Sequence, residues 1–421
     1  MVARVLGFRR DAQGHACFGS ARLSELVAAA QIETPAYLYD LDAIRAEAER
    51  LSAGFGSARH VIAYAVKANS AGSIVRALAE AGTGADVVSK AELQVALGAG
   101  VPAGKIVMSG VAKKDDEIDF AIAAEIHAIQ AESVEELARI AARARALGRR
   151  ARIAFRLNPG VEIDSHAHVA TGHDRAKFGI AKIDVSRALA AVDDAPNELS
   201  LVGLSAHIGS MLTALDPYRA SALHVCELAR ARHAHKPLEY ISFGGGFGID
   251  YGDKPAPTPA DFAAHGVRLL AEQRLDALTL VVEPGRSLVG AHGVLVATVV
   301  QAKQSGAQRW VMIDAGMNDL LRPALYAAKH RIEPLERAPG GPEWRVVGPV
   351  CESSDDFGAH TLGETAPHAV VIRDAGAYGF TMASEYNGRA LPSEVFVRDE
   401  RVVSVSASPG SAAWVKRRLE A

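Results

Sequence analysis

Short apolar segments alternate with segments of helical periodicity between residues 61 and 283. Eight apolar segments predict buried strands, because most of them are continuous rather than alternating. They are VIAYAV (61–66), ADVV (85–88), KIVM (105–108), IHAIQ (126–130), RIAFRL (152–157), LVGLSAHI (201–208), YISF (240–243) and LTLVVE (278–283). Apolar residues three and four positions apart predict helices between them, at 71–82, 90–100, 113–124, 133–148 and 216–235. This alternation builds right-handed βα units around a parallel sheet, and a count of eight favours a closed (β/α)8 TIM-type barrel.

The segments outside this range have a different pattern. The sequence KANSAG after the first strand lacks the G-x-G-x-x-G turn of an open dinucleotide-binding sheet. A further helical segment, 41–56, is expected to cover the barrel wall. From about residue 290, short β-type runs are separated by Gly, Pro and acidic turns, and the strand-like ARVLGFRR near the N-terminus belongs with them. We predict two domains: an α/β barrel over 36–288, and an all-β sandwich or barrel formed by 1–35 and 289–421.

Composition and charge exclude several classes of protein. The 421 residues include 46 basic and 49 acidic side chains, a net charge of -3, which indicates no nucleic-acid partner. The N-terminus has no apolar signal-peptide core, and the longest apolar runs are far shorter than the ~20 residues that span a bilayer, so no membrane partner is expected. Cys17, Cys226 and Cys351 are odd in number and far apart, which disfavours disulfides and favours a cytoplasmic location.

Polar residues and glycines follow the predicted strands. In a (β/α)8 barrel the carboxyl ends of all strands meet at one rim, where active sites are built. Residues distant in the sequence are therefore expected to converge there, namely Lys67, Asp86, Asn158, His207, Gly244–Gly246 and Glu283. Packing explains any one of them easily, but it explains the whole set poorly.

Each of these residues has a structural and a functional interpretation. Lys67 is either a lysine that reaches solvent at a strand end or a desolvated amine suited to a Schiff base. The run Gly244–Gly246 is either a strained turn or a backbone cradle for phosphate. Glu283 either pairs with Arg286 at the surface or keeps a pyridine nitrogen protonated. His207 is either a hydrogen-bonded core histidine or a ring that stacks on a flat cofactor.

Three histidines are close together in DSHAHVATGHD, at positions 166, 168 and 173. They are candidate metal ligands, but the segment is expected to be a loop. It also lacks the i, i+4 spacing of H-E-x-x-H on a helix. We therefore predict no metal site.

Several motifs resemble those of the fold-type III pyridoxal-phosphate decarboxylases: AYAVKAN, ADVVSKAEL, HIGS, GGGFG and EPGR. Four further segments are similar to the diaminopimelate decarboxylases within that family. They are TGHDRAKFGI (171–180), DAGMNDLLRPALY (314–326), VVGPVCESSD (346–355) and DAGAYGFTMASEYNGR (374–389). The resemblance extends from about residue 35 to residue 400.

The resemblance implies a cofactor, pyridoxal 5'-phosphate, and a role for each matching residue. Lys67 would form the Schiff base, His207 would stack on the ring, Asp86 would lie near the Schiff base, and Glu283 would pair with the pyridine nitrogen. The phosphate would be held by Ser210, Gly245, Gly246, Tyr378 and the backbone around Arg286. Arg286, Arg322 and Tyr326 would bind the distal carboxylate of the substrate, with Tyr378 nearby, and Glu352 would bind its distal amine. Cys351 would be the general acid. Members of the family are homodimers with shared sites, so Cys351, Glu352 and Tyr378 would come from the partner subunit.

The implied reaction is decarboxylation of meso-2,6-diaminopimelate to L-lysine and CO2 in lysine biosynthesis. Two arginines and a tyrosine suit a dianionic substrate, because guanidinium groups match carboxylates. The alternatives are a related decarboxylase of D-lysine, D-ornithine or a natural-product intermediate, a fold-type III racemase, and a non-catalytic regulator. A racemase fits less well, since an arginine rather than an acid would then face the ring nitrogen.

The chain departs from the family pattern at a few positions. Lys90 and Ala91 stand where a Gly-Gly pair is usual, and Met211 replaces a glutamine after HIGS. Ala327 and Lys329 alter the stretch after RPALY, and Glu385 replaces an asparagine before Tyr386. None of these changes removes a residue with an implied catalytic role.

Overall fold

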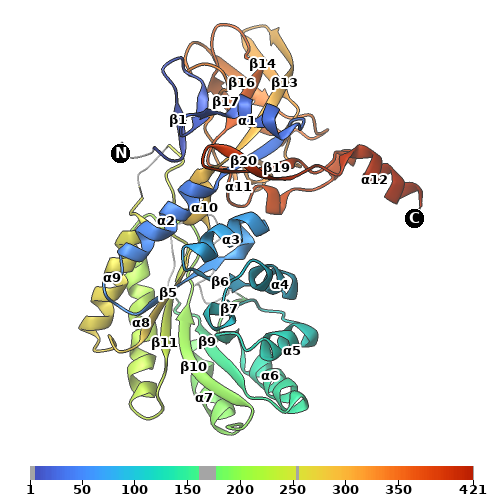
Figure 1. The fold of residues 1–421 in the computed structure, drawn as a ribbon. Helices are drawn as coiled ribbons and strands as arrows, with labels where there is room; N and C mark the ends of the chain where they lie inside the picture. The colour runs from blue at the N-terminus through green and yellow to red at the C-terminus, as the bar shows by residue number, and fades with distance from the viewer. Residues whose placement is uncertain (1–4, 161–176, 253–255, 421) are drawn as a thin grey trace. The chain divides into compact units, whose positions relative to one another are not determined.

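The computed structural model describes residues 5–160, 177–252 and 256–420. The chain divides into two compact units. One unit comprises Glu47–Asp250 and Pro255–Ser287, and the other comprises Met1–Ala46, Tyr251–Lys254 and Leu288–Ala421. Figure 1 shows the course of the chain through both.

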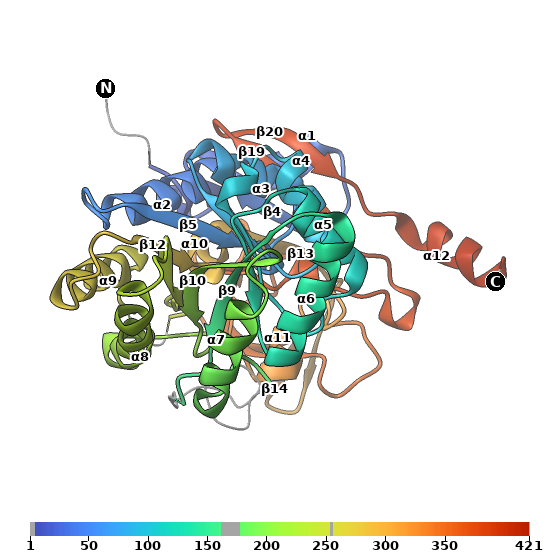
Figure 2. The ribbon, with the colours of Figure 1, turned by 90° about the horizontal axis from the view of Figure 1, so that it is seen from below.

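The first unit is a closed barrel of eight parallel strands, as predicted, in the order β10-β11-β12-β5-β6-β7-β8-β9. Each predicted strand corresponds to one barrel strand, with ends that differ by a few residues. The strands are β5 (His60–Ala65), β6 (Gly84–Val87), β7 (Ile106–Met108), β8 (Ala128–Ala131), β9 (Ala151–Leu157), β10 (Leu199–Ala206), β11 (Tyr240–Gly245) and β12 (Thr279–Glu283). In Figure 2 the helices surround these strands.

The helices of this unit largely follow the predicted periodicity. The predicted segments correspond to α2 (Leu41–Ala53), α3 (Gly72–Glu80), α4 (Lys90–Gly98), α5 (Asp115–Ala123), α6 (Val134–Leu147) and α8 (Leu215–His233). Ser133 caps α6 by accepting a hydrogen bond from the Glu136 backbone N–H at 3.1 Å, and Gly148 ends the helix in the left-handed conformation. Three described helices before residue 290 were not predicted: α7 (Val185–Asp193), α9 (Pro259–Glu272) and the short α10 (Arg286–Val289).

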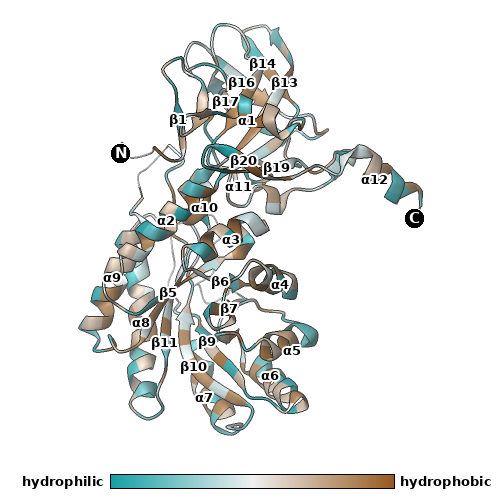
Figure 3. Ribbon diagram, viewed as in Figure 1, coloured by the Kyte–Doolittle hydropathy of each residue, from teal (hydrophilic) through white to brown (hydrophobic). Residues whose placement is uncertain are grey.

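The barrel interior is filled by small side chains around one large ring. Tyr240 of β11 is fully buried and packs in a cluster with Ala63, Ala128, Ala154 and other small residues. Gly203 of β10 makes room for it, because a Cβ there would lie 2.3 Å from the Tyr240 ring. The interior is therefore a packed core, and any site lies at the rim. Figure 3 shows hydrophobic residues along β9, β10 and β11.

The second unit is built on a nine-stranded sheet whose main path is β17-β16-β14-β13-β4-β19-β20, with β15 and β18 off this path. The long strand β13 (Gly293–Ser305) pairs with β4 (Ala36–Asp40), β14 (Gln308–Ile313) and β18 (Ala369–Ile372). The remaining strands are β15 (Ile332–Pro334), β16 (Glu343–Val347), β17 (Asp356–Thr361), β19 (Ser393–Arg398) and β20 (Arg401–Ser406). A separate three-stranded sheet comprises β1 (Phe8–Arg10), β2 (Ala16–Phe18) and β3 (Ala21–Arg22).

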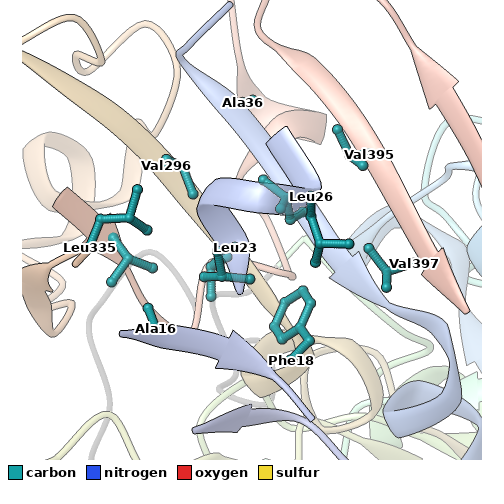
Figure 4. Packing of buried hydrophobic residues seen from close by; sticks show 12 residues of the cluster. Ala16, Phe18, Leu23, Leu26, Ala36, Val296, Leu335, Val395 and Val397 are labelled. Carbon is teal, nitrogen blue, oxygen red and sulfur yellow. The ribbon is translucent and has the colours of Figure 1, made fainter. Parts of the chain in front are cut away.

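Two features of this unit differ from expectation. The segment 36–40 falls inside the range predicted for the barrel, but as β4 it pairs with β13 and β19 in the nine-stranded sheet. Helices α1 (Leu23–Ala30), α11 (Arg322–Tyr326) and α12 (Gly410–Leu419) were not predicted in the β-rich domain. Figure 4 shows why α1 belongs here, since Leu23 and Leu26 pack against Phe18, Val296 and Val397.

We expect the Glu394→Gln variant to be more stable than the wild type at pH 8. Glu394 of β19 is buried and accepts a hydrogen bond from the Tyr39 hydroxyl at 3.1 Å. Burial raises the pKa of Glu394 to about 7, so the folded chain binds this proton more tightly than the unfolded chain. The contribution of Glu394 to the free energy of unfolding is therefore fully present at acid pH and is lost as the pH rises toward 7. The amide keeps the acceptor and carries no charge, so the variant gains up to about 3 kcal/mol above pH 7.

Thermal unfolding of both proteins between pH 4.5 and 8 measures this effect. The control Glu364→Gln changes a side chain that is 82% exposed, and its unfolding should match the wild type. Equal pH dependence of Glu394→Gln and the wild type would refute the assignment.

None of the described helices combines the length and the hydropathy of a membrane-spanning segment.

Candidate active site

Lys67 lies directly after the first barrel strand, in the short 3-10 helix η1 (Val66–Ala68) that follows β5. Its Nζ forms an ion pair with Asp86 of β6, and the Lys67 side chain is 38% exposed, whereas Asp86 is buried. The Ser109 hydroxyl, at the end of β7, donates a hydrogen bond to Asp86 Oδ1 at 2.5 Å. An amine that is held at the rim and remains reachable from solvent is suited to covalent attachment of a carbonyl compound.

Glu283 ends β12 and is held inside the rim by neutral side chains. Its Oε1 accepts hydrogen bonds from Gln130 Nε2 at 2.7 Å and from Ser242 Oγ at 2.8 Å. Gln130 in turn accepts a hydrogen bond from the Ser205 hydroxyl at 2.9 Å. Burial and then the charge of Asp86 raise the pKa of Glu283, while the bonds from Ser242 and Gln130 oppose the rise. Both bonds use one oxygen, so Oε2 is left without a hydrogen-bond partner among the described residues.

His207 follows β10, and its ring is neutral. Its Nδ1 accepts a hydrogen bond from the Gly245 N–H at 3.2 Å, which leaves Nε2 to carry the proton. Burial lowers the pKa of His207 to about 3, and the positive charges of Arg156 and Lys67 add to the effect. Arg156 is held by a buried ion pair with Glu132 at 2.9 Å. A neutral, fixed imidazole suits stacking better than acid–base chemistry at neutral pH.

The glycine run Gly244–Gly246, at the end of β11, tolerates no side chain. A Cβ at Gly245 would lie 1.9 Å from the Glu283 carbonyl oxygen, and one at Gly246 would lie 1.9 Å from the Gly209 carbonyl oxygen. Gly244 and Gly246 have φ of +71° and +81°, which also favours glycine. The Gly245 N–H, predicted to face a phosphate, is occupied by His207 in this structure.

Arg286 and Ser210 meet beside this run. Arg286 begins α10 (Arg286–Val289), is buried, and donates a hydrogen bond from Nη2 to Ser210 Oγ at 3.3 Å. The next residue, Ser287, is also buried, and its hydroxyl has no hydrogen-bond partner in the described part of the chain. An anion would match the charge of the buried Arg286 guanidinium, and it would accept a hydrogen bond from the Ser287 hydroxyl.

The other predicted site residues lie in the second unit. Arg322, at the start of α11, is buried and donates a hydrogen bond from Nη1 to His330 Nε2 at 2.8 Å. His330 Nδ1 donates to the Arg373 carbonyl oxygen at 2.9 Å, and the Arg322 guanidinium lies 4.9 Å from the centre of the Tyr251 ring. His330 and Tyr251 therefore fix the guanidinium. Tyr326, at the end of α11, is half-buried.

Cys351 and Glu352 lie in the turn after β16, and both are exposed. The Cys351 N–H donates to Asn387 Oδ1 at 2.9 Å, and the Tyr386 hydroxyl donates to Glu352 Oε1 at 2.5 Å. Tyr378, in the turn after β18, is half-buried and has a left-handed backbone with φ of +55°.

The three candidate metal ligands, at positions 166, 168 and 173, lie outside the described residues. Most of the segment 171–180 does so as well. In the ranges 5–160, 177–252 and 256–420, no group of three or more His, Cys, Asp or Glu side chains is placed to hold a metal ion.

The sequence of the barrel matches a known protein family. The profile described as "Pyridoxal-dependent decarboxylase, pyridoxal binding domain" matches residues 41–290, which include all of the barrel strands. This chain belongs to the pyridoxal-dependent decarboxylases. Two curated relatives of this decarboxylase are each named diaminopimelate decarboxylase. The protein of Zymomonas mobilis is 38% identical over 91% of this chain and 92% of its own. The protein of Neisseria meningitidis serogroup A is 40% identical over 86% of this chain and 89% of its own.

Solved structures agree with this assignment. The diaminopimelate decarboxylase of Helicobacter pylori, complexed with L-lysine, superposes on this decarboxylase with a TM-score of 0.87 at 36% identity, over 94% of this chain and 100% of that chain. The diaminopimelate decarboxylase of M. jannaschii, in co-complex with L-lysine, gives a TM-score of 0.90 at 33% identity, over 98% of each chain.

The rim of this decarboxylase fits a flat phosphorylated ring. The glycine run, buried Arg286 and the unpartnered hydroxyl of Ser287 suit a phosphate, and Glu283 has an oxygen available for a ring nitrogen. The sequence did not reveal the side chains that orient the candidate site residues. They are Ser109, Gln130, Glu132, Arg156, Ser205, Ser242, Tyr251, His330, Tyr386 and Asn387. The signal available for Gln130, Ser205 and Ser242 was a polar residue inside an apolar strand segment.

Proposed function

We propose that this decarboxylase converts meso-2,6-diaminopimelate to L-lysine and CO2, with pyridoxal 5'-phosphate as cofactor. The observation that carries the proposal is the rim, where the Lys67–Asp86 pair and buried Glu283 lie beside a glycine run that admits no side chain. The choice of substrate is supported by curated relatives of near full length that are named diaminopimelate decarboxylase.

Several side chains would hold the cofactor. Lys67 would form the covalent link, His207 would cover one face of the ring, and Asp86 would hold the Lys67 amine in place. Ser210, Gly245, Gly246, Arg286 and Tyr378 would bind the phosphate. Glu283 would keep the ring nitrogen protonated, and the bound ring then supplies the electron sink that C–COO⁻ cleavage requires.

The substrate would be held by opposite charges. Arg286, Arg322 and Tyr326 would bind the distal carboxylate, and the contacts of Arg322 with His330 and Tyr251 pre-orient its guanidinium. Glu352 would bind the distal ammonium, and Tyr378 would also contact the substrate. The Cys351 thiol would donate one proton to the carbon from which CO2 departs.

The first test is turnover by the purified protein. We expect a yellow protein that releases CO2 from meso-diaminopimelate, measured with ¹⁴C-carboxyl label or by coupled detection of L-lysine. D-lysine and D-ornithine should be poor substrates, because Arg322 and Arg286 would lack the distal carboxylate. Faster turnover of either would favour the related D-amino-acid decarboxylases, and a protein that takes up no cofactor would refute the function.

We also propose a cytoplasmic homodimer whose sites are shared between subunits. The exposed positions of Cys351 and Glu352 support this arrangement, since such groups suit a site completed by another subunit. The absence of any disulfide among Cys17, Cys226 and Cys351 supports a reducing compartment.

Mixing two inactive variants tests the shared site. Lys67→Ala and Cys351→Ala subunits, exchanged and re-associated, should recover about one quarter of wild-type activity, because half of the dimers are mixed and each has one intact site. Turnover of the mixed sample against each variant alone measures this. A mixture no more active than its components would show that each site is built from one chain.

A further inference from the structure

The turn η6 (Tyr386–Gly388) contacts the loop that carries Cys351 and Glu352. Tyr386 and Asn387 are adjacent, and they bind two adjacent residues. The Tyr386 hydroxyl donates to Glu352 Oε1 at 2.5 Å, and Asn387 Oδ1 accepts from the Cys351 N–H at 2.9 Å. The turn thus binds both the Glu352 side chain and the main chain of Cys351.

A third bond extends this contact along the loop. Arg389, directly after the turn, donates from Nη2 to the Pro349 carbonyl oxygen at 3.2 Å. The backbone of the turn is set by two left-handed residues, Asn387 with φ of +56° and Gly388 with φ of +71°. Asn is among the few residues other than Gly that adopt this conformation at low cost. Asn387 therefore serves both the shape of the turn and the bond to Cys351.

The other end of the loop is fixed independently. Asp355 is buried and accepts hydrogen bonds from the Val350 N–H and the Met317 N–H, each at 2.7 Å. The stretch between Val350 and Asp355 is thus fixed at its base. Within the loop the Glu352 N–H donates to the Val350 carbonyl oxygen at 2.8 Å, and the Glu352 carbonyl oxygen accepts from the Asp355 N–H at 3.1 Å. The Tyr386–Gly388 turn adds the bonds to the Cys351 N–H and to the Glu352 carboxylate.

The C-terminal helix α12 anchors the turn from outside. Arg417 forms an ion pair with Glu385, the residue before the turn. The Trp414 ring lies against Gly388, where a Cβ would be 3.4 Å from it. The carboxylate of Glu385 thus gives α12 an ionic partner directly before the turn.

We propose that Tyr386 and Asn387 are positioning residues for the decarboxylation, and that α12 stabilises their turn through Glu385 and Trp414. Tyr386 occupies one oxygen of Glu352 and orients the other toward the distal ammonium of the substrate. Asn387 fixes the main chain from which the Cys351 thiol delivers its proton. This inference rests on the proposed function, because it uses the roles proposed for Cys351 and Glu352.

The Tyr386→Phe variant tests the first part. We expect KM for meso-diaminopimelate to rise about 10-fold with little change in kcat, since a hydrogen bond to a charged group is lost from the binding step. For 2-aminopimelate, which has both carboxylates and no distal amine, the variant and the wild type should have equal KM. The control Ser20→Ala removes another hydroxyl–carboxylate bond of the same unit, to Glu400, and should change neither constant. Equal losses with both substrates, or no loss with meso-diaminopimelate, would overturn the role of Tyr386.

Asn387 is tested by two matched substitutions. Asn387→Gly keeps the left-handed backbone and removes the acceptor, so kcat should fall about 5-fold while KM stays near the wild-type value. Asn387→Asp restores an acceptor oxygen and should recover most of kcat. A glycine variant with wild-type kcat, or an aspartate variant no better than glycine, would overturn the role of Asn387.

The role of α12 is tested by removing it. No residue of α12 is buried, so a chain that ends at Pro409 loses no core side chain. We expect this chain to show the KM increase of Tyr386→Phe, and Arg417→Ala to show a smaller increase of about 2-fold. Wild-type constants in the shortened chain would overturn the role of α12.

One readout separates this inference from the proposed function. The bond to Glu352 raises the pKa of the Tyr386 hydroxyl. In the holoenzyme labelled with ¹³Cζ-tyrosine, Glu352→Gln should lower the pKa of the resonance that Tyr386→Phe removes. An unchanged titration would overturn the Tyr386–Glu352 contact even in an active enzyme. If the wild type did not turn over meso-diaminopimelate but Glu352→Gln still lowered the pKa of Tyr386, the proposed substrate would be refuted and the Tyr386–Glu352 contact would stand.

Discussion

We expect the Lys67→Ala variant to lose at least about 10³-fold in turnover of meso-diaminopimelate and to bind the cofactor only weakly. The expected loss is large because, in the proposed function, Lys67 would provide the amine to which the cofactor carbonyl attaches. Its neighbours support this role: Asp86 holds the Nζ, and the Ser109 hydroxyl holds Asp86. Steady-state kinetics, together with the visible absorbance of the purified variant, measure the two effects. The absorbance of cofactor bound through a Schiff base should be missing.

Two further variants make this result specific. Lys105→Ala changes a lysine of the same unit that donates to the Gly82 carbonyl oxygen at 2.9 Å, and it should keep wild-type turnover and colour. Asp86→Asn should keep the colour and lose part of the turnover, since the amine remains but its charged partner does not. A Lys67→Ala protein that retains both colour and turnover would show that another amine binds the cofactor.

The barrel could be predicted because a short local sequence pattern marks each of its strands. Segments such as VIAYAV and LTLVVE are short, apolar and bounded by polar residues, and they became β5 and β12 within a few residues. Helices with apolar residues at three- and four-residue spacing lie between them. The count of strands, together with the missing G-x-G-x-x-G turn after the first of them, therefore favoured a closed barrel over an open sheet.

The position of β4 could not be predicted because its partners are distant. The segment AYLYD is apolar and stands just before a helix, as the barrel strands do. It pairs, however, with 293–296 of β13 and with 393–397 of β19, more than 250 residues away. Local pattern does not encode such pairing. Likewise β17, DFGAHT, is mostly half-exposed and lacks the alternation that marks a strand.

In the candidate site, too, local patterns could be recognised in the sequence, whereas contacts between distant residues could not. Residues at strand ends, such as Lys67 and Glu283, could be found by position alone, because the fold sends them to one rim. The side chains that orient them could not, since Gln130 looks like an ordinary polar residue until β8 and β12 are seen in one barrel. His330 and Tyr386 were missed for a related reason, because they belong to no motif and each contacts a candidate site residue, Arg322 or Glu352.

The Glu283→Gln variant should lose about 100-fold or more in kcat. The amide keeps the shape of the side chain, and its oxygen still accepts the bonds from Gln130 and Ser242. Its other end is an N–H donor, which favours an unprotonated pyridine nitrogen and so weakens the electron sink. The loss should appear in kcat more than in KM, because a bond to the ring nitrogen matters most as charge develops in the transition state. Steady-state kinetics with meso-diaminopimelate measure both constants, and absorbance titration measures cofactor binding.

Two further variants distinguish the effect of the Glu283 charge from the effect of packing around it. Gln130→Met removes one of the two bonds to Glu283 and keeps the carboxylate, so its kcat should fall less, by about 10-fold. Glu125→Gln changes an exposed acid of the same unit, paired with Arg149, and should leave kcat unchanged. If Glu283→Gln were within about threefold of the wild type, the electron sink would not depend on this carboxylate. If Gln130→Met were the more damaging change, packing beneath the ring rather than the charge of Glu283 would be the controlling factor.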